Sequence, residues 1–236
     1  MPAHPDDIRI AAALARNDRY VREFVEAFNL CPYARRCRET GKLQRVVLLD
    51  AGGAPGTAAF DAAVHALAQA IEQLEQLPAD AIEVGLIVLP ALDDTLAAGP
   101  EGARAFEQLV RAARERMQAR YERGDTPFYC VAFHPHFAED LSDEHRAVRF
   151  IRRSPDPTVQ LVRASVLRAV RGVDSGGVQY IDVSKLSAAE LMAVSSPVPV
   201  SDRIGRANLR TLQAAGPERL RGLLVEIHAC HRDTDK

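Results

Sequence analysis

The sequence predicts an α/β fold with a small, mostly parallel sheet of three to four strands, flanked by helices and followed by a helical C-terminal extension. Two observations support this class. Short apolar segments of strand length alternate with longer segments of helical periodicity, which is typical of strand–helix–strand crossovers. The strand-like segments are apolar along almost their whole length, as expected when helices cover both faces of a sheet.

Four segments are predicted as strands because each is short, apolar and bounded by Gly, Pro or charged residues. They are Arg45–Asp50, Ile82–Leu89, Phe128–Phe133 and, with a weaker pattern, Val178–Val183. In open parallel sheets, ligands bind beyond the carboxyl ends of the strands. We therefore expect a site near Asp50, Pro90 and His134.

Helical periodicity fills the segments between the strands. The first helix is predicted over Ile8–Leu30, where Val21, Phe24 and Phe28 share one face and Pro32 ends the helix. Three further helices are predicted over Thr57–Leu77, Glu101–Arg123 and Asp156–Gly172. In the last of these, Asp156 is the expected cap and Pro157 the first helical residue.

The chain is expected to divide at about residue 194. Residues 1–194 would form the α/β domain that carries the site, and residues 195–236 a linker and a helical extension packed on the same domain. Pro197 and Pro199 indicate the linker. Apolar positions up to Leu212 and the Gly216–Pro217 pair indicate two C-terminal helices.

Composition argues against several classes of partner. The net charge of the 236 residues is -2 and the pI is about 6.4. No global positive field would attract nucleic acid or an anionic membrane. The N-terminal segment lacks a positive start followed by an apolar run, and no apolar stretch approaches the roughly 20 residues that span a bilayer. A cytoplasmic location is therefore expected, in which the four cysteines are thiols.

Cys31 is the first candidate for a reactive group. It stands in the segment Asn29–Ala34, where Pro32 suits the first position of a short helix. Cys31 would then occupy the cap, where helix N–H groups and the nearby Arg35 and Arg36 would lower the thiol pKa. The alternative is a small buried residue that closes the first helix against the core.

His134 and His136 flank Pro135 at the end of the third predicted strand. His134 could act as a base for Cys31 or for a substrate. Both histidines together with Cys31 could also form a zinc or iron site. A third possibility is that His134 only hydrogen-bonds the backbone at the corner after the strand.

A basic segment precedes the helix predicted after Asp156. The N–H groups of that helix, with Arg153 and Ser154, would form a pocket for an anion. Capping chemistry and surface arginines are the alternative explanation. His228, Cys230 and His231, near the C-terminus, could form a metal-binding cluster, but a frayed chain end is the favoured interpretation.

The chain resembles a bacterial family of uncharacterised proteins, domain of unknown function 1415. The resemblance covers about residues 16–212 and rests on these segments: Asn29-Leu30-Cys31-Pro32-Tyr33-Ala34, Phe133-His134-Pro135, Arg153-Ser154-Pro155-Asp156-Pro157 with Leu161 and Arg163, and Arg206–Leu212. The chain is longer than typical members and looks like a divergent branch. Leu89, His136 and Arg152 depart from the usual residues at their positions.

The resemblance implies that Cys31, His134, Arg153 and Ser154 belong to one constellation, with Arg163 beside them. The leading hypothesis is a cytosolic enzyme in which Cys31 is the nucleophile and His134 the base. Arg153, Ser154 and Arg163 would bind a small anionic substrate, and the reaction would be acyl or thiol transfer or hydrolysis, with no cofactor required. The alternatives are a zinc or iron protein that uses Cys31, His134 and His136, and a non-catalytic anion-binding module.

Overall fold

The computed structural model describes residues 4–49, 51–90, 94–122, 126–167 and 200–230. The helices in the N-terminal half are α1 (Pro5–Arg19), the π-helix η1 (Tyr20–Glu26), α2 (Ala34–Glu39), α3 (Ala58–Glu75), α4 (Asp94–Ala97) and α5 (Gly99–Gln118). Those that follow are α6 (Glu144–Ile151), α9 (Val200–Ala215) and α10 (Pro217–Ala229). The strands are β1 (Leu43–Val47), β2 (Val84–Val88), β3 (Phe128–Phe133) and β4 (Thr158–Arg163).

The four described strands form one sheet in the order β1-β2-β4-β3. Only β1 and β2 are parallel, while β4 is antiparallel to both β2 and β3. The α/β class and the helical C-terminal part are confirmed. The prediction of a mostly parallel sheet is wrong, because the chain runs from β3 through α6 and returns beside β3 in the opposite direction.

The helix predicted after Asp156 is also wrong, since β4 occupies that segment. Val159 and Leu161 are buried on one face of the sheet, while Gln160 and Val162 are half-buried on the other. This period of two is the strand pattern, and β-branched residues favour it. The spacing of Val159, Val162 and Val166 also fits a helix, which is why periodicity alone gave the wrong element.

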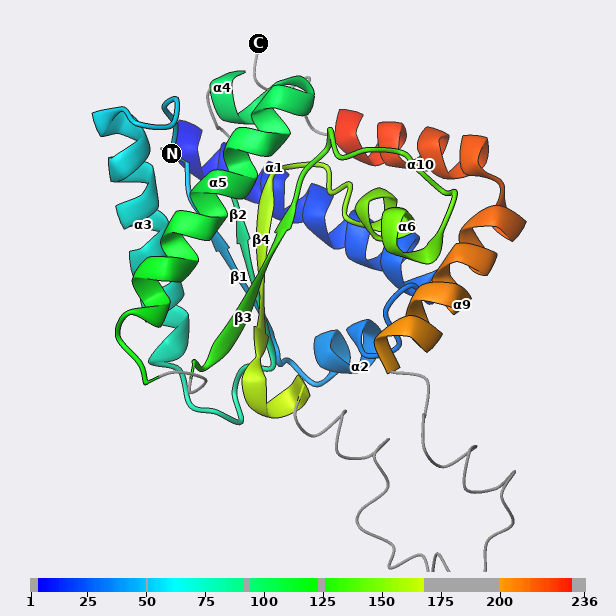
Figure 1. Ribbon diagram of the computed structural model, residues 1–236, viewed down its shortest axis with the longest axis horizontal. Coiled ribbons are helices and arrows are strands. Elements are labelled where there is room, and N and C mark those ends of the chain that lie inside the picture. Colours follow the sequence, from blue (N-terminus) through cyan, green and yellow to red (C-terminus); the bar gives the residue numbers. More distant parts are fainter. Residues whose placement is uncertain (1–3, 50, 91–93, 123–125, 168–199, 231–236) are drawn as a thin grey trace, which may run out of the picture.

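Two groups of helices cover the two faces of the sheet (Figure 1). Helices α3 and α5 pack on the face that carries Ile87, Val159 and Leu161, and this forms the larger hydrophobic core. The other face carries Leu86 and Phe133, and it packs with α1, η1, α6, α9 and α10. Alternation along each strand therefore decides which core a side chain enters.

Helices α9 and α10 complete the second core. Leu212 of α9 and Leu220 and Ile227 of α10 are fully buried in the same cluster as Phe24 of η1. The predicted C-terminal helices are thus present. The predicted strand 178–183 and residues 195–199 of the predicted linker 195–201 lie outside the described residues. The last two residues of that linker belong to α9, which begins at Val200.

The segment predicted as the first helix contains an α-helix followed by a π-helix. α1 continues directly into the seven-residue η1, in which Tyr20, Val21 and Phe24 are buried. π-Helices are rare and occur frequently at functional sites. No helix in the described part of the chain is long and apolar enough to cross a membrane.

Candidate functional site

The Cys31 segment is a tight connection between η1 and α2. Asn29 adopts a left-handed conformation with φ of 50°, and the Leu30 N–H donates to the Val25 carbonyl at 2.9 Å. The α-helix begins only at Ala34, with Tyr33 as its cap. The prediction that Cys31 caps this helix is therefore wrong, although its carbonyl accepts a hydrogen bond from the Ala34 N–H at 3.2 Å.

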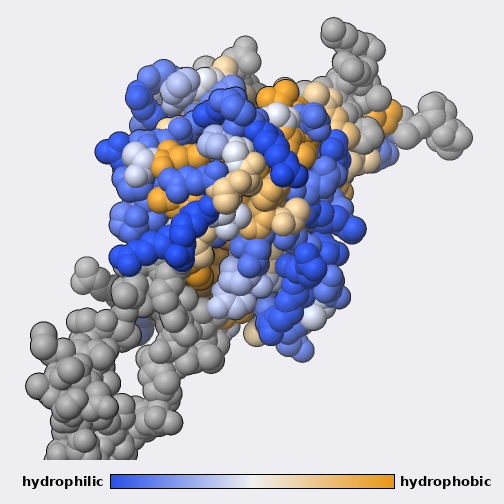
Figure 2. Space-filling view, turned by 90° about the vertical axis from the view of Figure 1, so that its right-hand side faces the viewer, coloured by the Kyte–Doolittle hydropathy of each residue, from blue (hydrophilic) through white to orange (hydrophobic). Residues whose placement is uncertain are grey.

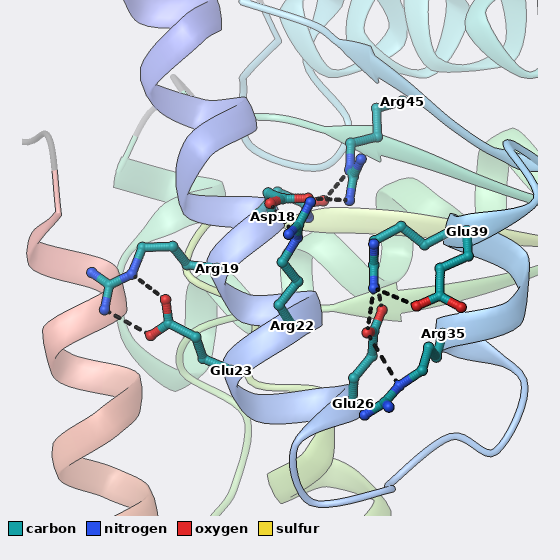
Figure 3. A network of polar contacts seen from close by, with 10 residues as sticks. Asp18, Arg19, Arg22, Glu23, Glu26, Arg35, Glu39 and Arg45 are labelled. Carbon is teal, nitrogen blue, oxygen red and sulfur yellow. Dashed lines mark hydrogen bonds and ion pairs between the residues drawn. The ribbon is translucent and has the colours of Figure 1, made fainter.

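Ion pairs hold this connection at both ends. Glu26, at the end of η1, accepts hydrogen bonds from Arg38 of α2 at 2.7 and 2.8 Å. Figure 3 shows Glu26 facing Arg35 of the same helix. The Glu26 side chain is only 4% exposed, and the Arg38 hydrogen bonds lower its pKa. Arg35 also pairs with Glu26, and Arg36 pairs with Glu83. The basic residues after Cys31 are thus engaged with carboxylates.

The pKa of the Cys31 thiol is raised, contrary to the expectation from the sequence. Burial is the main cause, and hydrogen bonds from the backbone N–H groups of Tyr33 and Ala34 only partly offset it. The reason for the difference is that Arg35 and Arg36 face Glu26 and Glu83 rather than the sulfur. Cys31 is therefore a neutral thiol at pH 7.

Cys31 lies in the wall of a cavity of about 240 Å³ between the sheet and η1. The walls are mostly apolar and come from η1, the Cys31 connection, one sheet face and the residues after β4. The lining residues are Asn17, Tyr20, Val21, Val25, Leu30, Cys31, Tyr33, Ala34, Cys37, Leu43, Glu83, Val84, Leu86, Phe133, Ile151, Ser154, Thr158, Gln160, Val162, Val166 and Leu167. Neither His134 nor His136 lines this cavity.

His134 lies on the other face of the sheet. Its neighbour Phe133 lines the Cys31 cavity, whereas the His134 ring packs against Phe106 of α5 and against Phe137. Successive residues of an extended chain point to opposite faces, which explains the separation. The structure therefore does not bring Cys31 and His134 together as a nucleophile and its base.

Both nitrogens of His134 are already occupied by the protein. Nε2–H donates to the Leu96 carbonyl at 2.9 Å, and Nδ1 accepts from the His136 backbone N–H at 3.2 Å. The side chain is fully buried, and burial lowers its pKa to about 4. His134 thus joins α4 to the end of β3. Both of its hydrogen bonds go to the backbone, as in the third possibility predicted from the sequence.

The residues of the proposed metal site are likewise separated. Cys31 belongs to one face of the sheet and His134 to the other, so they cannot share one ion with His136. Among the described residues there is no group of three or more His, Cys, Asp or Glu side chains that could hold a metal. The donor set therefore does not fit the zinc or iron hypothesis.

Arg153 and Ser154 stand in a loop rather than before a helix. Ser154 is buried, and its hydroxyl donates to the Asp156 carbonyl at 2.5 Å. Arg153 donates from Nε to the Pro135 carbonyl at 2.9 Å and also pairs with Glu139. Because β4 follows, the helix N–H groups expected to bind an anion are absent from this site.

Arg163 lies at the opposite end of β4 from Ser154. Its guanidinium donates to the carbonyls of Ile82 and Leu77 at 2.8 and 3.4 Å and lies 4.7 Å from the centre of the Phe128 ring. It is buried and has a structural role in joining β4 to the loop before β2. The structure does not bring it together with Arg153.

Two contacts at this site were not foreseen from the sequence. Arg16 of α1 forms a buried, two-point ion pair with Asp156, with N–O distances of 2.9 and 3.0 Å. Asn208 of α9 donates to the Leu30 carbonyl at 2.9 Å and so holds the residue before Cys31. Asn208 lies in the Arg206–Leu212 segment, which is part of the family resemblance. Only the fold shows that its partner is the Leu30 carbonyl.

His228 and Cys230, near the C-terminus, both have defined contacts. His228 belongs to α10, and its Nδ1–H donates to the Pro155 carbonyl at 2.7 Å. Cys230 accepts a hydrogen bond from Arg16 at 3.5 Å through its carbonyl. The expectation of a frayed end is wrong for these two residues, and His231 lies outside the described residues.

The family model described as "Protein of unknown function (DUF1415)" matches residues 12–181. This range includes the Cys31 connection, β1 to β4 and the Arg153–Asp156 loop. No curated protein and no solved structure matches the chain.

Proposed function

Since the chain belongs to the DUF1415 family, whose function is unknown, we propose from the geometry that it binds a small, mostly apolar molecule in the Cys31 cavity. The cavity itself is the observation that carries this proposal. Its wall combines apolar side chains of η1 and the sheet with a few polar groups, among them Cys31, Ser154 and Gln160. Apolar walls with few polar groups are typical of small-molecule sites.

The volume restricts the size of the molecule. A cavity of about 150 Å³ admits benzene, and sites for drug-sized ligands begin at about 300 Å³. A cavity of about 240 Å³ therefore suits a molecule of intermediate size, such as a two-ring aromatic compound or a short alkyl chain. The π-helix η1 gives further support, because it provides one wall and π-helices frequently occur at functional sites.

Indole is a suitable probe of this cavity. The chain contains no tryptophan, so the fluorescence of added indole can be followed without background from that residue. We expect saturable binding with a blue-shifted emission. In Val162→Phe, the added ring would occupy the cavity and weaken indole binding at least about tenfold. Ile8→Phe, at an exposed position on α1, is the matched control and should bind as the parent does.

Val25→Phe repeats the test from the η1 wall of the same cavity. Circular dichroism and thermal unfolding would show that each variant is folded. Binding that is unchanged in both folded cavity variants would place indole elsewhere and contradict the proposal.

Cys31 should respond to pH and to the ligand. Because burial raises the pKa of this thiol above the ordinary value of 9, alkylation by iodoacetamide should be slow at pH 7 and should still accelerate above pH 9. Saturating indole should slow the reaction, since both reagents would occupy the same cavity. Peptide mass spectrometry would report the rate at Cys31 separately. Fast alkylation at pH 7 would contradict a buried, neutral Cys31 thiol. An unchanged rate with indole present would argue against indole binding beside Cys31.

A further inference from the structure

A glutamine lies on the sheet face that forms one wall of the Cys31 cavity. Gln160 belongs to β4, which pairs with β2 on one side and with β3 on the other, so it stands in the interior of the sheet. Leu86 lies opposite Gln160 on β2, and Val162 follows Gln160 on the same face of β4. Both of these apolar residues also line the cavity. The side-chain amide of Gln160 is thus placed among apolar side chains.

The hydroxyl groups of this cavity wall hydrogen-bond within the protein. The Tyr20 hydroxyl donates to the Ile151 carbonyl at 2.5 Å. The hydroxyls of Ser154 and Thr158 both donate to the Asp156 carbonyl, at 2.5 and 2.9 Å. These three side chains therefore use their donors to hold the wall together.

The other oxygen acceptors of the wall also have partners. The Asn17 side-chain oxygen accepts from Arg45 at 2.8 Å. The Glu83 carboxylate accepts from Arg36 at 2.9 Å and from Lys42 at 3.1 Å, so its charge is balanced. Among the described residues, no arginine or lysine lines the cavity. The wall therefore favours a neutral ligand.

The Gln160 side chain differs from these polar groups, because its amide has no hydrogen-bond partner within the described part of the chain. Figure 2 shows the side of the molecule that carries α9 and α10, which is largely hydrophilic with apolar residues in its middle. Polar residues on that side face water, whereas Gln160 is half-buried and lines the cavity between the sheet and η1. A polar group placed in this way needs a partner from water or from a ligand.

We infer that Gln160 recognises the polar group of the molecule that occupies the Cys31 cavity, and that this molecule is a neutral amide with an apolar body. This inference rests on the proposed function and specifies its ligand class. A lactam matches glutamine at two points, because its N–H donates to Oε1 of Gln160 and its carbonyl accepts from Nε2. A carboxylate lacks the donor and would bring an unbalanced charge beside apolar side chains.

2-Quinolone and 2-methylnaphthalene test this inference, because both are two-ring compounds of similar shape and only the first contains an amide. Equilibrium dialysis against the full chain measures the binding of each compound. Gln160→Met keeps an unbranched side chain of similar length and removes the amide. We expect this variant to bind 2-quinolone about tenfold more weakly, the loss expected for two neutral hydrogen bonds. Its binding of 2-methylnaphthalene should be as tight as that of the parent or tighter.

Gln69 provides the matched control. It lies at an exposed position of α3, outside the cavity wall, so Gln69→Met should change neither affinity. Thermal unfolding gives a second measurement on Gln160→Met. This variant should be at least as stable as the parent, because the amide that it lacks has no partner within the described residues. A glutamine with a structural role would instead cause a loss of stability on replacement.

The outcomes separate the inference from the proposed function. If Gln160→Met weakens neither compound, or weakens both equally, the inference is overturned. In that case Val162→Phe should still weaken both compounds, and the apolar site would stand. A less stable Gln160→Met that binds 2-quinolone as the parent does would assign Gln160 to the structure alone and also overturn the inference. Absence of binding of indole and of both compounds to the parent chain would remove the proposed function, and the inference with it.

Discussion

Replacement of Asp156 by asparagine is expected to lower the free energy of unfolding by about 3–5 kcal/mol. The carboxylate is 1% exposed and pairs at two points with Arg16, which is 5% exposed. Asparagine keeps the shape of the side chain but leaves the Arg16 guanidinium buried without an opposite charge. The loss is large because the unpaired charge of Arg16 stays buried in a low-dielectric environment.

Urea-induced unfolding followed by circular dichroism would measure this loss. Glu107→Gln is the matched control, since Glu107 pairs with Arg149 at the surface and exposed pairs contribute about 1 kcal/mol or less. Equal losses in the two variants would show that the Arg16–Asp156 pair is not a buried anchor between α1 and the loop before β4. A larger loss in Asp156→Asn would explain why the Arg153–Pro157 segment contains an aspartate at this position.

Acidification is expected to remove about 3 kcal/mol of stability through His134 alone. The pKa of His134 is about 4 in the folded protein and about 6.5 for an unperturbed histidine. The unfolded chain therefore binds the proton more readily between these values. The contribution of neutral His134 is fully present above about pH 6.5 and is lost as the pH falls toward 4.

The comparison of the parent with His134→Gln isolates this contribution, because carboxylate titration affects both proteins. Glutamine retains a donor and an acceptor but does not titrate in this range. The difference in unfolding free energy between parent and variant should therefore change between pH 6.5 and 4. A pH-independent difference for His134→Gln would contradict the buried, neutral state of the imidazole.

The cavity beside Cys31 gives the motif residues a common explanation that does not require catalysis. Leu30 is held by α9 through Asn208, and the Cys31 connection is held by the Glu26–Arg38 pair between η1 and α2. Ser154 lines the same cavity. Segments that resemble the family therefore form part of the wall of this cavity and its supports.

Several elements of the fold could be predicted from local patterns. The strand Phe128–Phe133 was predicted with the bounds of β3, and α3 lies within the predicted Thr57–Leu77 helix. The Thr57 hydroxyl caps α3 as expected, by accepting from the Phe60 N–H at 3.2 Å. Apolar periodicity and capping residues act within one element, so no distant partner is needed to recognise them.

The element after Asp156 could not be predicted in this way. The spacing of its valines fits both a helix and a strand. The segment becomes a strand because β4 can pair with β2 on one side and with β3 on the other. Asp156 also resembles a helix cap in sequence, yet its partner Arg16 lies 140 residues away. Such long-range partners override local propensity because they add contacts that the isolated segment lacks.

The sequence by itself determined the α/β class and most of the helices, and it drew attention to Cys31 and Ser154, which line one cavity. Tertiary structure alone decided which segments share a face. His134 follows Phe133 directly, but the alternation of an extended chain sends their side chains into different cores. It also decided the state of Cys31, because burial and ion pairs to distant carboxylates outweigh the basic residues beside it in sequence.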